Sequence, residues 1–331
     1  MFYPIIYPQN VEVYQRDTSN GKLYASFLDA VEGLFCEGDD PAIDGKPGSH
    51  ACGAFKPANV ITISYAVVEW AFSPAILQRQ CNEWMKLDLQ GTSVFHASGD
   101  VGVVGPVFVS CSGSNKSIFN PIATATCPYI TTVDSTEMQK DTSETGKEVV
   151  CKTRYSPGGG FSNVFPRPDY QDAAVSAYLA NHAGNLTSYN ITETAVPVDS
   201  SGGRYNRAGR GYPDISALGS HSYVILKGEE KHYGGTSMSA PIAAAVFNRI
   251  NEECLAAGKK TVGFVNPALY KNPSMFHDIT LGGMRKVRPA ACGGASFDAT
   301  PGRDSVTDLG TPNYLEMLKY YNYNYLKVAK L

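Results

Sequence analysis

The 331-residue sequence predicts an α/β fold with a doubly wound, mostly parallel sheet that carries helices on both faces. Two β-branched runs of strand length, residues 59–65 and 92–97, predict two strands. A helical pattern lies between them, and strand, helix, strand predicts a parallel pair with a right-handed crossover. Both runs are almost continuously apolar or β-branched, which is typical of strands covered on both faces.

The helix between these strands has clear boundary signals. Ser73 supplies an N-cap, Pro74 fits the first helical position, and Gly91 ends the pattern. Its apolar side recurs at helical spacing and comprises Leu77, Cys81, Trp84 and Met85.

Further elements are predicted along the rest of the chain. Residues 222–226 form a strand, 241–257 a buried helix, and 169–183 another helix, while 184–210 form a long surface loop. With 43% apolar residues, the chain is long enough for one large domain with a covered sheet.

The composition excludes several classes of partner. A formal net charge of -3 and a pI near 6.1 give no basic field for nucleic acid. No apolar stretch reaches the roughly 20 residues needed to cross a bilayer, so we expect no membrane association. We expect a monomer.

The eight cysteines favour an oxidising compartment, since none forms the C-x-x-C pair of a zinc or redox site. Two pairings close short polar loops and are preferred, Cys36 with Cys52 and Cys111 with Cys127, although other connectivities remain open. Glycosylation sequons begin at Asn115, Asn185 and Asn190.

The run Gly235-Thr236-Ser237-Met238-Ser239-Ala240-Pro241 places Ser237 on a tight glycine turn before an apolar helix. There its hydroxyl projects at a helix N-terminus, where the helix dipole favours negative charge. The alternative is an ordinary serine N-cap on a core helix.

A second turn, Ser98-Gly99-Asp100, follows the second predicted strand. By itself it could be only a turn at the edge of the sheet. Together with the Ser237 motif, it resembles the signature of the sedolisin peptidases, which share a subtilisin-like fold. The resemblance implies that Ser237 is the nucleophile and that Asp100, when protonated, donates a hydrogen bond to the oxyanion.

The histidines separate this family from the subtilisins, because none of the six stands in a subtilisin-type His-Gly-Thr-His block. We interpret His96 and His232, the two nearest to the motifs, as ordinary structural side chains. The resemblance to fungal sedolisins extends over nearly the whole chain and includes residues 3–10, 81–91, 158–171, 209–219 and 266–274.

The resemblance implies a secreted acid serine peptidase that acts on peptides or proteins, as a tripeptidyl-peptidase or an endopeptidase. The substrate strand would be Ser64, Tyr65 and Ala66. The family has glycine where Ala66 stands, and a methyl group there could crowd a substrate. This departure leaves open an alternative, a non-catalytic pseudopeptidase that binds peptides.

The resemblance also implies one Ca²⁺ ion, held by Asp278, Ile279, Thr300, Gly302 and Asp304. The usual Gly-Trp-Asp-Pro-Val-Thr-Gly is replaced by residues 302–308, which read GRDSVTD. Arg303 would repel a neighbouring cation. The alternative is a polar surface loop without metal.

The family's general base is a glutamate in a Glu-x-x-x-Asp helix that precedes the segment matching residues 3–10. The given chain starts after that position and has no export signal or propeptide, so the sequence predicts a peptidase domain over 1–331 that is incomplete at its N-terminus. Glu12 and Asp17 follow the segment and are interpreted as solvated side chains. We therefore expect this chain to be catalytically impaired.

Overall fold

A computed structural model describes residues 2–15, 23–38, 40, 42–43, 51–105, 110–139, 147–182, 184, 186–190, 202–284 and 291–323. Its central sheet has four parallel strands in the order β1, β2, β3, β9, with β4 antiparallel to the end of β3. The bounds of these strands are Val60–Ile63 (β1), Ser93–Ala97 (β2), Thr131–Met138 (β3), Glu148–Val150 (β4) and Ile215–Leu218 (β9).

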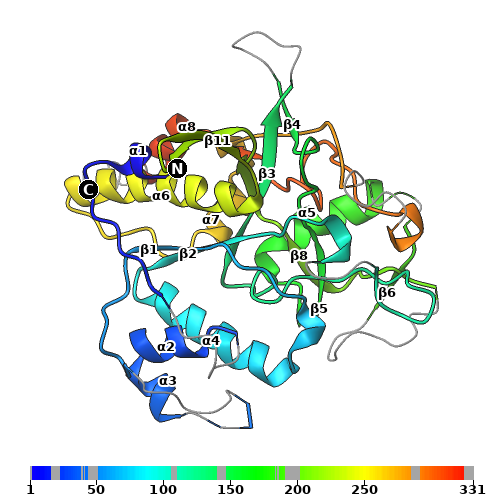
Figure 1. Cartoon of the computed structure of the whole chain (residues 1–331), viewed down its shortest axis with the longest axis horizontal. Helices are drawn as coiled ribbons and strands as arrows, with labels where there is room; N and C mark the ends of the chain where they lie inside the picture. The colour runs from blue at the N-terminus through cyan, green and yellow to red at the C-terminus, as the bar shows by residue number, and fades with distance from the viewer. Residues whose placement is uncertain are drawn as a thin grey trace.

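Helices cover both faces of this sheet, as Figure 1 shows. The long helix α6 (Thr236–Ala256) lies on one face, and α4 (Pro74–Leu89) lies on the other with α2 (Ala25–Val31) beside it. The doubly wound, mostly parallel fold is therefore confirmed. The signals at the start of α4 are confirmed too, because the Ser73 hydroxyl accepts a hydrogen bond from the amide of Ile76.

The remaining elements are short and lie mostly around this sheet. Their bounds are Tyr3–Ile6 (α1), Gly33–Glu37 (α3), Asp169–Asn181 (α5), Asn266–Lys271 (α7), Tyr314–Leu318 (α8), Gly160–Pro166 (β5), Ser188–Tyr189 (β6), Tyr205–Asn206 (β7), Gly209–Tyr212 (β8), Ser222–Leu226 (β10), Glu229–Tyr233 (β11), Phe276–His277 (β12) and Thr311–Pro312 (β13). Among the described helices, none has both the length and the apolar composition needed to cross a membrane.

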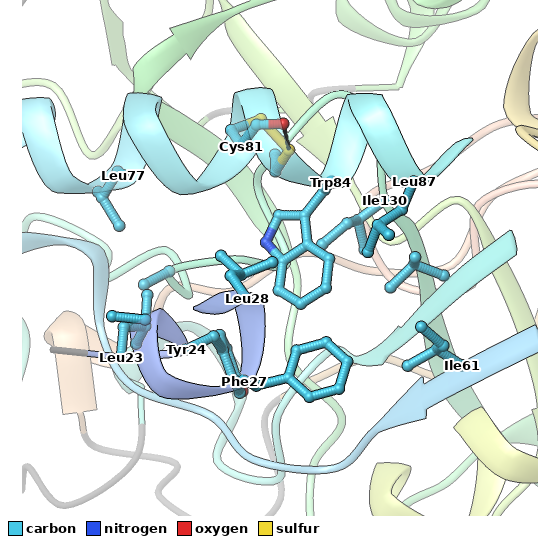
Figure 2. Close-up of a cluster of buried hydrophobic side chains, with 14 of the residues drawn as sticks. Leu23, Tyr24, Phe27, Leu28, Ile61, Leu77, Cys81, Trp84, Leu87 and Ile130 are labelled. Atoms are coloured by element: carbon cyan, nitrogen blue, oxygen red, sulfur yellow. Dashed lines mark hydrogen bonds between the residues drawn. A yellow bond between two sulfur atoms is a disulfide. The ribbon is translucent and has the colours of Figure 1, made fainter. Parts of the chain in front are cut away.

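An aromatic cluster fills the space between α2, α4 and the sheet (Figure 2). The ring of Phe27 stacks on that of Trp84 at 5.8 Å, and Tyr24 meets the same indole edge-on at 5.8 Å. Leu77 and Cys81, two of the apolar positions that predicted α4, lie in this cluster. Trp84 lies there too, whereas the fourth predicted position, Met85, is half-buried and outside the cluster, so the helical period identified most of the buried face of α4.

On the opposite face, α6 packs closely because its inner side carries small residues. Ala240, Ala243 and Ala244 are buried against the strands, and Phe247 packs on Phe95 of β2 with 4.9 Å between ring centroids. Adjacent residues of β2 thus enter different cores, Val94 toward α4 and Phe95 toward α6. This alternation explains why the whole strand is apolar or buried.

Three predictions about elements need correction. Helix α6 begins at Thr236, five residues before the predicted start at residue 241. The strand predicted at 222–226 exists, but as β10 it pairs only with β11 in a hairpin outside the central sheet. The predicted surface loop 184–210 contains β6, β7 and part of β8, and its last residue, Arg210, is fully buried and paired with Asp214 at 2.5 Å.

The sequon asparagine Asn185 and the segment 191–200 lie outside the described residues.

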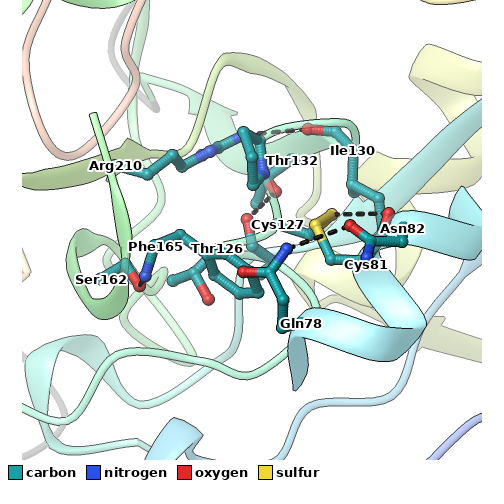
Figure 3. Close-up of a disulfide and its surroundings, with 12 residues drawn as sticks. Gln78, Cys81, Asn82, Thr126, Cys127, Ile130, Thr132, Ser162, Phe165 and Arg210 are labelled. Atoms are coloured by element: carbon teal, nitrogen blue, oxygen red, sulfur yellow. Dashed lines mark hydrogen bonds between the residues drawn. A yellow bond between two sulfur atoms is a disulfide. The ribbon is translucent and has the colours of Figure 1, made fainter. Parts of the chain in front are cut away.

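One preferred disulfide is confirmed and the other is wrong. Cys36 pairs with Cys52, but Cys111 pairs with Cys292, and Cys127 pairs with Cys81 (Figure 3). The short loop between Cys111 and Cys127 suggested their pairing, whereas the fold instead brings Cys127 beside helix α4. Cys151 and Cys254 are buried and unpaired.

We predict that Cys292→Ser releases Cys111 as a new reactive thiol and leaves the pairing of Cys127 unchanged. Thiol labelling followed by peptide mapping under non-reducing conditions measures this. Labelling of Cys127 in this variant would contradict the connectivity. Loss of the long Cys111–Cys292 cross-link should also lower the stability by about 2–5 kcal/mol, measured in denaturant.

Candidate active site

Ser237 lies in the first turn of α6, where its side chain is exposed. The preceding Gly235 is the N-cap, with φ at +148°, a conformation that strongly favours glycine. The turn therefore presents the serine hydroxyl at the positive end of a 21-residue helix. This is the placement that the sequence predicted for a nucleophile.

Pro241 leaves a backbone carbonyl in this turn free to accept a hydrogen bond from Ser64. A proline has no amide hydrogen, so the carbonyl four residues earlier, that of Ser237, lacks its normal helical partner. The Ser64 hydroxyl donates to that carbonyl at 3.1 Å. The end of strand β1 is thereby attached to the start of α6.

Asp100 contacts the residue immediately before Ser237. Its Oδ1 accepts hydrogen bonds from the amide of Thr236 at 2.7 Å and from the Thr236 hydroxyl at 2.9 Å. Burial raises the pKa of Asp100, and the two bonds from Thr236 oppose that rise. The structure therefore brings Ser64, Asp100 and Ser237 together from three separate segments.

The two turns are interlocked through Thr236. Its hydroxyl, which donates to Asp100, also accepts a hydrogen bond from the amide of Gly99 at 3.1 Å. A Cβ atom at Gly235 would stand 3.1 Å from Asp100 Oδ2, so the glycine also leaves room for the carboxyl group. Gly235, Thr236 and Asp100 thus each have a geometric role at the contact between the two motifs.

The next two residues of the proposed substrate strand differ in their surroundings. Tyr65 is 57% exposed, and its carbonyl accepts a hydrogen bond from the Tyr24 hydroxyl at 3.0 Å. The methyl group of Ala66 packs against a buried cluster of Val68, Ile122, Ala125 and Tyr212. This methyl group therefore packs toward the protein interior, which weakens the expectation that it crowds a substrate.

The two histidines nearest the motifs have structural roles, as predicted. His96 is fully buried, where its Nδ1 lies 2.7 Å from the Ala97 carbonyl and its Nε2 lies 3.3 Å from the Tyr24 hydroxyl. Burial lowers the pKa of His96 to about 4. His232 is exposed on β11 and packs edge-on against Tyr223.

Glu69, which the sequence did not single out, is a buried carboxylate just after the proposed substrate strand. Its oxygens accept hydrogen bonds from the hydroxyls of Thr126 and Ser162 and from the amide of Asn163. Burial raises the pKa of Glu69 to about 6. No motif marks this residue, because its three donors come from segments distant in the sequence.

The residues predicted to bind calcium lie on two segments that contact each other, residues 278–279 after β12 and residues 300–304, and the Ile279 carbonyl accepts a hydrogen bond from the Thr307 hydroxyl at 3.2 Å. Asp278 Oδ2 accepts a hydrogen bond from the amide of Gly302 at 2.7 Å, and Asp304 Oδ2 accepts one from the amide of Thr300 at 2.9 Å. Asp304 Oδ1 accepts further bonds from the amides of Val306 and Thr307. Within the described ranges, no group of three or more His, Cys, Asp or Glu residues could hold a metal, so any ion here would depend on two carboxylates and backbone carbonyls.

Arg303 and Asp308, two departures from the family pattern, contact each other inside the fold. Arg303 Nε lies 2.7 Å from Asp308 Oδ2, and both side chains are almost completely buried. A third departure, Ser305, accepts a hydrogen bond from Arg303 Nη1 at 3.1 Å. Asp308 therefore compensates the positive charge of Arg303. The expectation that Arg303 repels a neighbouring cation did not include this partner.

We predict that Arg303→Met destabilises the fold by about 3–5 kcal/mol, because it leaves the buried Asp308 without its cation. The double variant Arg303→Met with Asp308→Asn should recover most of this loss. Urea unfolding of the wild type, both single variants and the double variant measures the coupling. Additive effects of the two substitutions would show that the pair is not coupled.

Comparisons with known proteins identify relatives of this chain, although no family model matches it. Aorsin of Aspergillus oryzae is 42% identical over 347 residues, which cover 96% of this chain and 52% of aorsin. Tripeptidyl-peptidase sed1 of Aspergillus fumigatus is 41% identical with the same coverage, and human tripeptidyl-peptidase 1 is 35% identical over 79% of this chain and 43% of its own length.

Among solved structures, a Pseudomonas sedolisin, a serine-carboxyl proteinase complexed with pseudo-iodotyrostatin, superposes with a TM-score of 0.58. It is 20% identical and covers 81% of this chain and 66% of its own, so it supports the fold alone. The chain spans about half the length of the curated relatives it matches. The extent of the sequence similarity, together with this fold, shows that the chain belongs to the sedolisin family.

Proposed function

We propose that this protein contributes to hydrolysis of peptide bonds in peptides or proteins, with Ser237 as the nucleophile and Asp100 as the oxyanion donor. The observation that carries the proposal is the pair of hydrogen bonds from Thr236 to Asp100 Oδ1. Those bonds fix a carboxyl group next to the first turn of helix α6, which carries Ser237. The names of the relatives, aorsin and the tripeptidyl-peptidases, support the same class of reaction.

The geometry gives Asp100 a defined protonation site. Because Oδ1 already accepts two hydrogen bonds, a proton is better placed on Oδ2, the oxygen that faces Gly235. Burial raises the pKa of Asp100, so the protonated form persists to higher pH than for an exposed aspartate. A proton at Oδ2 can stabilise the negative charge that develops on the substrate carbonyl oxygen.

Residues 64–66 are proposed to bind the substrate backbone. Tyr65 is exposed at the end of parallel strand β1, and Ser64 is attached to the Ser237 carbonyl. An extended peptide could add beside this segment as an extra strand, which places its scissile bond near Ser237. Release of tripeptides and internal cleavage are both compatible with this arrangement.

Several sequence-based expectations stay predictions. They are secretion, glycosylation, a monomeric state and the impairment of the 331-residue polypeptide assayed alone. The pseudopeptidase alternative also stays open, but Ala66 supports it less than the sequence suggested, because its methyl group packs inward. Peptidase activity of the purified chain that Ser237→Ala abolishes would contradict both impairment and the pseudopeptidase alternative.

We predict different kinetic effects for two substitutions of Asp100. Wild-type turnover should fall as the pH rises through the pKa of Asp100, because only the protonated carboxyl donates. Asp100→Asn should lose this fall, since an amide can accept from Thr236 through its oxygen and donate through its nitrogen at any pH. Asp100→Ala should be slower by roughly 100- to 1,000-fold at all pH values.

The kinetic measurement is kcat/KM for a peptide substrate from about pH 3 to about pH 8, and the comparison with Asp100→Asn separates the titration of Asp100 from those of Glu69 and His96. Ser237→Ala serves as the control for contaminating activity. If kcat/KM of Asp100→Asn falls with rising pH as it does in the wild type, another group is titrating. Asp100 would then not be the oxyanion donor.

We also propose one Ca²⁺ ion held by Asp278, Ile279, Thr300, Gly302 and Asp304, where the segment after β12 meets the loop at residues 300–304. An oxygen-only donor set suits this hard cation, and Thr300 Oγ1 is buried without a hydrogen-bond partner among the described residues. Pairing of Arg303 with Asp308 removes the main electrostatic objection. When bound, the ion would supply structural cross-linking of the loop and no chemistry at Ser237.

We predict that Ca²⁺ raises the melting temperature of the wild type and that EGTA reverses the gain. At 100 times the dissociation constant the stabilisation would be about 2.7 kcal/mol. Asp278→Ala should abolish the response, whereas Glu230→Ala, an exposed carboxylate on β11, should keep it. Equal responses in the two variants would place the ion elsewhere, and no response in the wild type would remove the calcium proposal.

A further inference from the structure

Tyr155 is buried directly beneath the turn that carries Ser237. Its hydroxyl donates to the carbonyl of Gly219 at 2.7 Å. The same carbonyl accepts a hydrogen bond from the amide of Gly235 at 2.9 Å. Tyr155 and the N-cap of α6 therefore share one acceptor, which lies just beyond the end of strand β9.

The packing around Gly219 leaves no room for a side chain at this position. A Cβ atom on Gly219 would stand 2.1 Å from Ser135 Oγ, 2.2 Å from Ser239 Oγ and 2.6 Å from the Tyr155 hydroxyl oxygen. Ser135 and Ser239 are themselves hydrogen bonded at 2.5 Å. These three hydroxyl groups enclose Gly219 and connect strand β3, strand β9 and the first turn of α6.

The segment after Tyr155 contacts the second proposed catalytic turn. Ser156 forms a parallel bridge with Val101, and its carbonyl accepts from the amide of Gly102 at 3.0 Å. Further along, a Cβ atom on Gly158 would stand 2.4 Å from the Ser98 carbonyl, so this segment lies against the turn that holds Asp100. Residues 155–158 thus contact both turns. The Tyr155 side chain reaches the carbonyl that anchors the Ser237 turn, and the backbone of residues 156–158 lies against the Asp100 turn.

From these contacts we infer that Tyr155 is a positioning residue that sets the Ser237 turn relative to Asp100. The inference rests on the proposed function for its catalytic meaning. Burial raises the pKa of Tyr155, so its hydroxyl stays a hydrogen-bond donor throughout the working range. Without this donor, the Gly219 carbonyl should be held less firmly in place. The hydrogen bond that the carbonyl accepts from the Gly235 amide should then open more often.

The test is amide hydrogen exchange in Tyr155→Phe, a change that keeps the ring and removes only the hydroxyl. We expect residues 234–237 to exchange on the order of 5-fold faster than in the wild type. Tyr170→Phe is the matched control, since its hydroxyl also donates to a backbone carbonyl, that of Pro128, but outside the two turns. The control should leave exchange at 234–237 unchanged.

Where turnover is measured, Tyr155→Phe should lower kcat by roughly 10-fold with little change in KM. The substitution disturbs the alignment of Ser237 with Asp100 and leaves substrate binding intact. Unchanged exchange at 234–237, or equal acceleration in both variants, would overturn the inference. Failure of the proposed function would appear instead as peptidase activity that Ser237→Ala leaves unchanged, and it would not alter the role of Tyr155, which hydrogen exchange at residues 234–237 decides by itself.

Discussion

The hydrogen bonds from Thr236 to Asp100 hold together the two turns on which the proposed chemistry depends. One turn follows strand β2, and the other begins helix α6, more than a hundred residues later. Parallel strands end at the same edge of a sheet, so the doubly wound fold brings such turns together. The remaining contacts, from Ser64 to the Ser237 carbonyl and from Gly99 to Thr236, reinforce this junction.

Under the proposed function, this junction would let a carboxyl group act as a hydrogen-bond donor to the oxyanion. Hydrogen bonds to Oδ1 stabilise the ionised form, while burial disfavours it, and burial is the larger effect. The result is an acid held in a fixed orientation with one oxygen directed toward the turn. In that proposal, a single side chain would link the activity to acidic conditions.

The sequence predicted those parts of the fold whose signals are local. Helix α4 has its cap, its apolar period and its stop within 19 residues, and both flanking strands were recognised from their β-branched runs. The motifs around Asp100 and Ser237 likewise carry their turns and glycines in short segments. Their convergence could be expected from the parallel topology and the family resemblance.

Features that depend on distant partners were missed. Cys111 lies close to Cys127 in the sequence, but it pairs with Cys292, 181 residues away. Arg303 was interpreted as a repulsive neighbour because its partner Asp308 becomes evident only when both side chains are buried together. Tyr155 and Glu69 belong to no motif, since their importance comes from the backbone groups and hydroxyls that the fold places around them.

The most direct test of the account is the pKa of Asp100, measured by ¹³C NMR of the labelled carboxyl groups with Asp100→Asn for assignment. The account predicts a midpoint above the ordinary aspartate value of about 3.9. A midpoint at or below that value would mean that the bonds from Thr236 outweigh burial. Asp100 would then be an ionised cap of α6, which contradicts its role as the oxyanion donor.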